Sequence, residues 1–303
     1  MAQSLRGTFT PLLTPFTTEG SIDFPALGGL IADQLSARVE GLVMLGTTGE
    51  SPTIEAPEFD QIVGFAVKQA KGKSMVIAGV GSNDTKRTID QARRAEDLGV
   101  DGLLVLCPYY SKPTQMGIRL HFEAIAEAVG VPQIVYNIAG RTGINVETDT
   151  LVALSGHPCI IGVKEASNDI DQIMTVIDQT PDDFSVLCGS DHLNLTLMCH
   201  GGDGVISTLA NLVPKSVKAL VDAVLVGDLH RARRLHYQLL PLARGCFLEG
   251  NPIPVKTALA MQGKLEEMFR LPICPMQPET RQIWQNILRD HRLLPAEAGA
   301  AAA

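Results

Sequence analysis

The sequence lacks the features that direct a chain to a membrane, to nucleic acid or to the cell exterior. Its longest apolar runs have the length of a strand and fall short of the ~18 residues that a membrane span requires. No stretch is rich in lysine and arginine, and the net charge is −8, which disfavours binding to a phosphate backbone. Residues 1–7 show no basic and then apolar signal pattern. We therefore expect a cytoplasmic protein with neither a membrane nor a nucleic acid as partner.

Disulfide, cofactor and metal motifs are also missing. The six cysteines form no CxxC pair, and a chain of 303 residues needs no disulfide framework, which favours a reducing compartment. Cys107 and Cys188 directly follow apolar runs and are expected to be small buried hydrophobic residues. Gly79-Val80-Gly81 has no third glycine for a dinucleotide loop, the histidines show no metal-ligand spacing, and no serine lies in a GxSxG motif. We expect no cofactor and no metal.

The sequence does contain a regular alternation of short apolar runs and helical patterns. Runs rich in valine, isoleucine and leucine, with little polar alternation, are typical of parallel strands covered on both faces. Eight such runs are present: Thr8–Leu13, Gly41–Leu45, Ser74–Gly79, Gly102–Leu106, Gln133–Asn137, Cys159–Val163, Phe184–Leu187 and Gly204–Ser207. Eight β-α units predict a (β/α)8 TIM barrel, an α/β fold. The alternative is an open doubly wound sheet, which the missing dinucleotide motif disfavours.

Helical periodicity continues beyond the eighth run. Patterns with a 3.6-residue period cover Asp228–Leu248, Ile253–Gln262 and Glu279–Arg289. We interpret residues 1–225 as the barrel and 226–295 as a C-terminal helical appendage packed on it. The alanine-rich residues 296–303 are expected to form a disordered tail.

Lys164 is the strongest candidate for a catalytic residue, because the active site of such a barrel lies at the carboxyl ends of the strands. It directly follows the apolar residues 160–163, and strand alternation places it on the same face as Ile160 and Gly162, inside the barrel if that face points inward. Burial favours a neutral amine, which is a nucleophile for carbonyl carbons. A Schiff base on Lys164 is one interpretation. The other is a lysine in a polar loop that pairs with an acid such as Glu165.

Hydroxyl groups gather on the same predicted rim, which is the end of the barrel where the carboxyl ends of the strands meet. Three of the four tyrosines, Tyr109, Tyr110 and Tyr136, fall at strand ends, and the second run leads into Thr47 and Thr48. Schiff-base formation needs several proton transfers, which a phenol can perform when a neighbouring hydroxyl shares the proton. Each tyrosine alone could equally be a half-buried aromatic residue with a satisfied hydroxyl.

Two loop segments could bind an anion. Arg141 lies five residues after Tyr136, where its guanidinium could clamp a carboxylate with two hydrogen bonds or remain a solvated surface charge. The glycine-rich segment 201–204 resembles a phosphate cradle, but it precedes the eighth strand and therefore lies at the opposite end of the barrel. We interpret it as a turn.

Together these residues resemble the dihydrodipicolinate synthase and N-acetylneuraminate lyase family of class I aldolases, from Gly7 to about Leu294. The motifs that carry the resemblance are Gly46-Thr47-Thr48-Gly49-Glu50-Ser51, Pro108-Tyr109-Tyr110, Tyr136-Asn137, Arg141-Thr142-Gly143, Ile160–Ala166, Gly204-Val205-Ile206-Ser207, Ala210-Asn211 and Asn251-Pro252-Ile253-Pro254-Val255-Lys256. The resemblance implies that Lys164 forms an imine with pyruvate and that Tyr136 gives and takes the proton. Thr47 and Tyr110 would complete a proton relay. Tyr110 would reach into the active site of a neighbouring subunit, in a homotetramer built as a dimer of dimers.

The resemblance also assigns binding residues and a second substrate. Thr48 would hold the pyruvate carboxylate, and Gly189 and Ile206 would line the pocket. Arg141 would receive the carboxylate of L-aspartate 4-semialdehyde, giving 4-hydroxy-tetrahydrodipicolinate for lysine and diaminopimelate biosynthesis. Thr47 and Arg141 favour this synthase branch, because the lyase branch usually has serine at the first position and lacks the arginine.

Departures from the family pattern leave other functions open. The residues Ile138-Ala139, Cys188–Asp191 and Cys107 differ from the common family residues and bear on the second substrate rather than on the imine. The nearest alternative is a pyruvate-dependent aldolase or dehydratase that acts on a 2-keto-3-deoxy sugar acid or N-acetylneuraminate. A non-catalytic barrel that senses a 2-oxo acid is a further one.

The resemblance finally implies a lysine-inhibition site at the subunit interface. Family members present a glutamate to the ammonium of the bound lysine, with histidines beside it. The matching positions here are Arg87 for the glutamate, and Ala56 and Phe59 for the histidines. Ser51, Asn83 and Tyr109 still match. Because a cation replaces a carboxylate, we expect lysine to inhibit poorly or not at all.

Overall fold

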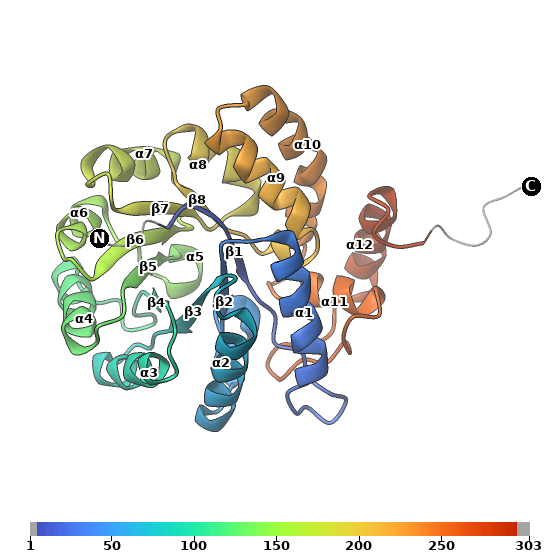
Figure 1. Ribbon diagram of the computed structural model, residues 1–303, viewed down its shortest axis with the longest axis horizontal. Coiled ribbons are helices and arrows are strands. Elements are labelled where there is room, and N and C mark those ends of the chain that lie inside the picture. The colour runs from blue at the N-terminus through green and yellow to red at the C-terminus, as the bar shows by residue number, and fades with distance from the viewer. Residues whose placement is uncertain (1–4, 296–303) are drawn as a thin grey trace, which may run out of the picture.

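The computed structural model describes residues 5–295 and contains a closed barrel of eight parallel strands in sequence order (Figure 1). The strands are β1 Gly7–Pro11, β2 Gly41–Met44, β3 Met75–Val80, β4 Gly102–Leu106, β5 Gln133–Asn137, β6 Ile160–Glu165, β7 Ser185–Cys188 and β8 Gly204–Ile206. The barrel closes where β8 pairs with β1. The (β/α)8 prediction is confirmed, and each observed strand overlaps its predicted run.

Helices surround the barrel on the outside (Figure 1). Those that belong to the β-α units are α1 Phe24–Ala37, α2 Ala56–Ala70, α3 Thr85–Asp97, α4 Gln115–Ala128, α6 Thr148–Ser155, α7 Ile170–Gln179, α8 Asn194–Cys199 and α9 Pro214–Leu225. The short helix α5 Ala139–Thr142 directly follows β5 and does not belong to this outer ring. Several begin at a side chain that accepts from a free amide of the first turn, as Asp84 does for α3 and Thr114 does for α4. Such caps fix the residue at which each of these helices begins.

Two apolar layers hold the barrel. The larger one lies between the strands and the surrounding helices. The smaller one contains a side chain from every strand, which is possible only inside a closed barrel: Phe9, Val43, Ile77, Leu104, Ile134, Tyr136, Ile161, Leu187 and Ile206, with Leu5 and Ala166. The interior is therefore a packed core, as expected for eight strands, and the open space lies at the strand ends.

Strand β6 departs from simple alternation. Gln133 of β5 pairs with Ile160 but Ile134 pairs with Gly162, so Ile161 is an extra residue in a β-bulge. Ile160 consequently packs in the outer layer while Ile161 packs inside. The prediction that Lys164 shares a face with Ile160 is therefore wrong, although Gly162 and Lys164 do share one. The strand also extends two residues further than predicted, so Lys164 lies within β6.

The C-terminal segment contains α10 Leu229–Gly245, α11 Ile253–Met261 and α12 Pro278–Asp290. Helix α10 packs on α8 and α9, and α12 packs on α10 and α11. Trp284 of α12 is fully buried, donates its indole N–H to the carbonyl of Pro254 at 2.7 Å, and fits against Gly245, where a Cβ atom would lie 2.0 Å from the ring. The helices predicted here are present. The boundary at residue 225 stays a prediction, and the alanine-rich tail lies outside the described residues.

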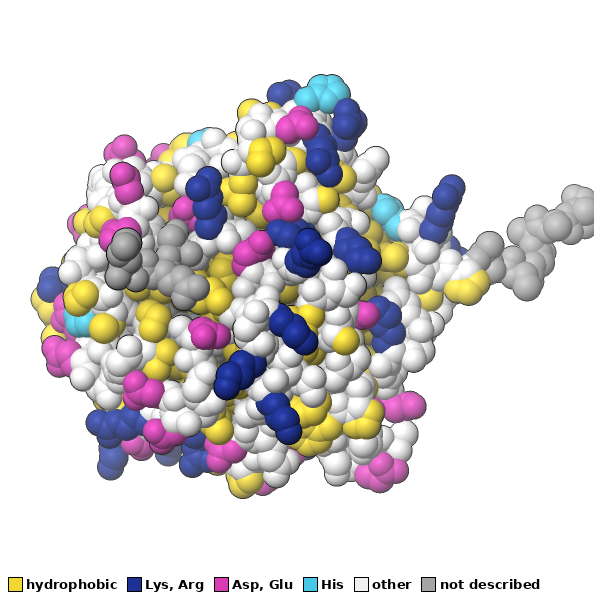
Figure 2. Space-filling view, in the orientation of Figure 1, with side chains coloured by type: hydrophobic (Ala, Val, Ile, Leu, Met, Phe, Trp, Pro, Cys, Tyr) yellow, Lys and Arg dark blue, Asp and Glu magenta, His cyan; other side chains and the backbone are white. Residues whose placement is uncertain are grey.

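None of the helices in residues 5–295 combines the length and the apolar character needed to cross a bilayer. On the face shown in Figure 2 the lysine and arginine side chains are mostly separated by acidic, polar and apolar ones. Cys107 and Cys188 are buried free thiols, as predicted. Burial raises the pKa of both to about 12, so both thiols stay protonated at neutral pH.

Candidate active site

Lys164 and Tyr136 face each other inside the carboxyl end of the barrel. They are paired in register on neighbouring strands, and each is 5% exposed. The ammonium nitrogen of Lys164 lies 4.2 Å from the centre of the Tyr136 ring. A buried amine beside a phenol is the pair that Schiff-base chemistry requires.

Glu165 does not pair with Lys164. Its carboxylate accepts from the backbone N–H of Ser167 at 2.7 Å, from Nδ2 of Asn137 at 3.1 Å and from Nε2 of Gln172 at 3.4 Å. Burial raises the pKa of Glu165, and these hydrogen bonds oppose the rise. The alternative in which Lys164 belongs to a polar loop and pairs with Glu165 is therefore wrong.

Gly189 and Ile206 border Lys164 on the other side. Gly189 follows β7, and its N–H donates to the carbonyl of Glu165 at 2.8 Å. A Cβ atom at Gly189 would lie 3.0 Å from Cε of Lys164, so only glycine leaves room for the lysine side chain. Ile206 of β8 is 1% exposed and belongs to the inner layer.

A buried carboxylate, Asp191, lies just beyond Gly189. It accepts from the hydroxyl of Ser207, from the N–H of Leu209 at 2.9 Å and from Nδ2 of Asn194 at 3.3 Å. Burial raises its pKa, while these hydrogen bonds and the charge of Lys164 act in the opposite direction. Sequence reasoning did not include Asp191 in the candidate site. Its position three residues after a strand end was the available signal.

The threonine pair forms a tight turn after β2. Residues Thr47–Gly49 form a single 3₁₀ turn, and Glu50 after it has a positive φ of 56°. Thr48 is buried, and its hydroxyl oxygen accepts from Nδ2 of Asn251 at 2.9 Å. Among residues 5–295, the hydroxyl of Thr47 has no hydrogen-bond partner. It is therefore free to accept or donate a proton.

Arg141 lies on the short helix α5 and is exposed. Its Nη2 donates to the carbonyl of Asn251 at 3.0 Å, and within the described part of the chain it contacts no carboxylate. Asn251 thus connects Arg141 to Thr48. This role of Asn251 could not be read from the sequence, since 203 residues separate it from Thr48.

A cavity of about 420 Å³ opens beside this group and is lined by both Tyr136 and Thr47. Lys164 itself does not line it and lies against the Tyr136 ring. The cavity continues outward to the positions predicted for the lysine site: Ser51, Ala56, Phe59, Asn83, Arg87 and Tyr109. The structure therefore brings those six residues together next to the rim.

Tyr110 is the one predicted catalytic residue that the structure does not bring to the others. Its side chain is 84% exposed, and its backbone has a positive φ of 71°, which is costly for a residue with a bulky side chain. Its N–H donates to the carbonyl of Thr142 at 3.3 Å. The ring thus projects away from the rim of its own chain.

Within residues 5–295, no three histidine, cysteine, aspartate or glutamate side chains come together as ligands for a metal ion. The expectation that the reaction needs no metal stays a prediction.

Comparison with known proteins identifies the family. The model of the dihydrodipicolinate synthetase family matches residues 4–291. The 4-hydroxy-tetrahydrodipicolinate synthase of Protochlamydia amoebophila is 45% identical over 296 residues, which cover 97% of this chain and 98% of that protein. The enzyme of the same name from Koribacter versatilis is 44% identical over 291 residues, which cover 96% of this chain and 97% of that protein.

Comparison with solved structures leads to the same family. The dihydrodipicolinate synthase of Thermotoga maritima superposes with a TM-score of 0.94 at 40% identity, covering 96% of this chain and 100% of that one. The dihydrodipicolinate synthase of Aquifex aeolicus gives a TM-score of 0.93 at 41% identity, and the match covers 95% of this chain and 99% of that one. Since the similarity spans the barrel, the rim residues and the C-terminal helices alike, this chain belongs to the dihydrodipicolinate synthetase family.

Proposed function

We propose that this protein condenses pyruvate with L-aspartate 4-semialdehyde to give 4-hydroxy-tetrahydrodipicolinate, through a Schiff base on Lys164. The observation that supports it most directly is the buried Lys164 amine against the Tyr136 ring, at the carboxyl end of the barrel. Family membership and the names of the relatives support the choice of substrates.

The chemistry follows from an amine in a site shielded from water. The nitrogen of Lys164 attacks the keto carbon of pyruvate, and the resulting carbinolamine loses water to form an imine. The protonated imine draws electrons from the methyl carbon, which loses a proton and becomes the nucleophilic carbon of an enamine. That carbon attacks the aldehyde of the second substrate. The amine of the same substrate then attacks the imine carbon, closes the ring and releases Lys164.

Each step moves a proton, and Tyr136 is the group that moves it. The open hydroxyl of Thr47 lines the same cavity and passes the proton on. Tyr110 completes the relay in the site of a neighbouring subunit, which accounts for its exposure and for its strained backbone in a single chain. The working unit is therefore at least a dimer, and we propose a tetramer built as a dimer of dimers.

The substrates are held by groups on both sides of Lys164. Thr48 binds the pyruvate carboxylate, and Gly189 and Ile206 line the pocket around the methyl group. Arg141, which has no carboxylate partner among residues 5–295, binds the carboxylate of aspartate semialdehyde. A sugar acid or N-acetylneuraminate lacks a carboxylate at that position, which separates the nearest alternative from this proposal.

Borohydride trapping followed by turnover tests the proposal. With pyruvate, borohydride is expected to fix a reduced pyruvyl group on Lys164 and to inactivate the protein, and Lys164→Ala is expected to form no adduct. Turnover is then measured with pyruvate and a panel of aldehydes, beginning with aspartate semialdehyde. Adduct formation without turnover of any aldehyde would indicate a sensor of 2-oxo acids. Loss of activity in a chelator would indicate a metal-dependent aldolase.

A further inference from the structure

We propose that Lys256 of the helical appendage is a positioning residue for the active-site turn, which it holds through an ion pair with Glu50. The inference rests on the proposed function and deepens it, since it assigns the C-terminal helices a part in the reaction. Neither Lys256 nor Glu50 touches the reacting atoms in the mechanism above.

The ion pair is fully buried. Nζ of Lys256 lies 2.5 Å from Oε1 of Glu50, and both side chains are 0% exposed. The ammonium also lies 4.2 Å from the centre of the Phe16 ring and 5.1 Å from that of Phe269. A charge in such a place needs its partner, because an unpaired buried ammonium or carboxylate is costly. The two residues therefore hold each other in one position.

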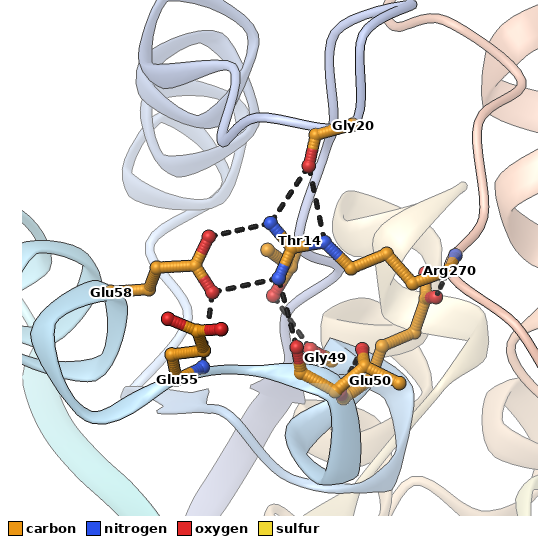
Figure 3. Close-up of polar contacts among 8 residues, drawn as sticks. Thr14, Gly20, Gly49, Glu50, Glu55, Glu58 and Arg270 are labelled. Carbon is orange, nitrogen blue, oxygen red and sulfur yellow. Dashed lines mark hydrogen bonds and ion pairs between the residues drawn. The ribbon is translucent and has the colours of Figure 1, made fainter.

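The other carboxylate oxygen of Glu50 is held by the appendage as well. Oε2 accepts from the backbone N–H of Arg270 at 3.3 Å. The guanidinium of Arg270 in turn forms two ion-pair contacts with Glu58 and hydrogen bonds to the carbonyl of Gly20, as Figure 3 shows. Glu58 lies in the first turn of α2, which follows the active-site turn after a second 3₁₀ turn at Ser51–Thr53. Both ends of the segment from Glu50 to Glu58 are thus fixed to the C-terminal part of the chain.

Three consecutive residues of the turn are anchored, whereas the hydroxyl of the residue before them has no hydrogen-bond partner among residues 5–295. Thr48 is bound by Asn251 at 2.9 Å, the carbonyl of Gly49 accepts from the hydroxyl of Thr14 at 2.7 Å, and Glu50 is bound by Lys256. Of these four residues, Thr47 is the one that lines the cavity. Glu50 and Leu45 both have a positive φ of 56°, so the backbone on each side of the turn is strained and requires external support. Lys256 supplies that support at the end nearest α2.

Lys218 offers a matched control. It forms a lysine-glutamate ion pair of 2.6 Å with Glu40, which directly precedes β2, whereas Glu50 follows the turn at the other end of β2. Lys218 belongs to α9 and lies outside the candidate site. Lys218→Met therefore removes a lysine-glutamate ion pair near the opposite end of β2, together with the ion pair of Lys218 with Asp222, without touching the turn.

The first test is kinetic. Lys256→Met is expected to lower kcat between roughly 10- and 100-fold and to raise the KM for pyruvate, since small displacements of a positioned group have effects of this size. In a Thr47→Val background the same substitution is expected to lower kcat by less than about twofold, because the group that it positions is gone. Lys218→Met is expected to leave kcat within about twofold in both backgrounds. Fully additive losses for Lys256→Met and Thr47→Val would overturn the proposal.

The second test does not depend on turnover. Hydrogen exchange at the amides of residues 47–50 is expected to accelerate at least about tenfold in Lys256→Met and to stay unchanged in Lys218→Met.

If Lys256→Met fails to fold, the double variant Glu50→Gln/Lys256→Met removes both charges and takes its place. If wild-type protein forms the pyruvate adduct but rejects aspartate semialdehyde, only the proposed substrate fails, and the rate of adduct formation replaces kcat. Unchanged exchange at residues 47–50 would overturn the inference even if the proposed function holds.

Discussion

Gly189 lies so close to Lys164 that a single methyl group at that position would be 3.0 Å from Cε of the lysine and 2.9 Å from Cβ of Ala166. Ala166 cannot easily move away because its Cβ is fixed to the backbone directly after β6. The space beside Lys164 is therefore set by a glycine that directly follows the neighbouring strand β7.

Gly189→Ala is expected to slow formation of the pyruvate adduct, because overpacking costs about 1–3 kcal/mol and the flexible lysine is the side chain that can yield. That range corresponds to a loss of roughly 5- to 150-fold in the trapping rate. Single-turnover borohydride trapping measures it. Gly29→Ala is the control, since Gly29 has no atom within 4 Å of its would-be Cβ. A Gly189→Ala protein that forms the adduct at the wild-type rate would contradict the assigned role of Gly189.

Arg141→Ala is expected to spare the pyruvate adduct but to impair turnover with aspartate semialdehyde. A charge-assisted bidentate contact contributes roughly 1.5–3 kcal/mol, so kcat/KM should fall between about 10- and 200-fold. Arg119→Ala serves as control, because the contact that Arg119 forms within residues 5–295 is a helical ion pair with Glu123 on α4. Unchanged kinetics in Arg141→Ala would favour the sugar-acid aldolase.

Tyr110 and Lys164 are expected to complement each other between subunits. Tyr110→Phe and Lys164→Ala proteins should each be inactive, yet a mixture should regain part of the activity, because some sites then combine an intact Lys164 with an intact Tyr110 from a neighbour. Activity after mixing and subunit exchange is the measurement. A fully active monomer in analytical ultracentrifugation at assay concentration would rule out the shared site.

Lysine is expected to inhibit poorly, because Arg87 stands at the position from which family members present a glutamate to the ammonium of the ligand. Its side chain is 77% exposed and 3.9 Å from Asp84, and it lines the cavity with Ala56 and Phe59. Arg87→Glu should therefore introduce or strengthen inhibition, whereas Arg93→Glu, the same charge change on an exposed position of α3, should not. A midpoint below about a millimolar in the wild-type protein, equivalent to about 4 kcal/mol of binding, would show the expectation to be wrong.

His121 is expected to make folding sensitive to acid. It is 5% exposed, with Nδ1 2.9 Å from the hydroxyl of Thr85, and burial lowers its pKa from 6.5 to about 4. Below pH 6.5 the unfolded chain binds a proton that the folded chain binds only near pH 4. This contribution to stability is therefore complete above pH 6.5 and is lost as the pH falls to 4, by about 3 kcal/mol.

Urea unfolding at several pH values between 7 and 4 measures this loss. His121→Leu should flatten the dependence of the unfolding free energy on pH. Thr85→Val should lower stability at every pH and keep the slope, since it removes a hydrogen bond but leaves the imidazole. An equal slope in His121→Leu and wild-type protein would refute the assignment.

Local sequence patterns predicted most of the fold and the rim. Uninterrupted apolar runs specify strands covered on both faces, so all eight were found, and side chains at strand ends converge in a closed barrel whatever their distance in sequence. Long-range pairings had no such signal. Nothing in the sequence near Glu50 indicates that its partner is Lys256, 206 residues away, and the contact of Thr48 with Asn251 spans 203. The proposed role of Tyr110 requires a second chain, which the pattern of one sequence does not describe.

The bulge at Ile161 determines which charged side chain points into the barrel. Counted from Ile160 by strict alternation, Lys164 would point toward the helices and Glu165 toward the interior. One extra residue in β6 reverses that order. Two adjacent residues of opposite charge thus compete for a single inward place, and whether Ile161 is paired or bulged determines whether the barrel contains an amine or a carboxylate. A β6 that paired Ile161 in regular register would exchange the nucleophile for an acid, whereas deletion of Ile161 would remove the bulge and keep Lys164 opposite Tyr136.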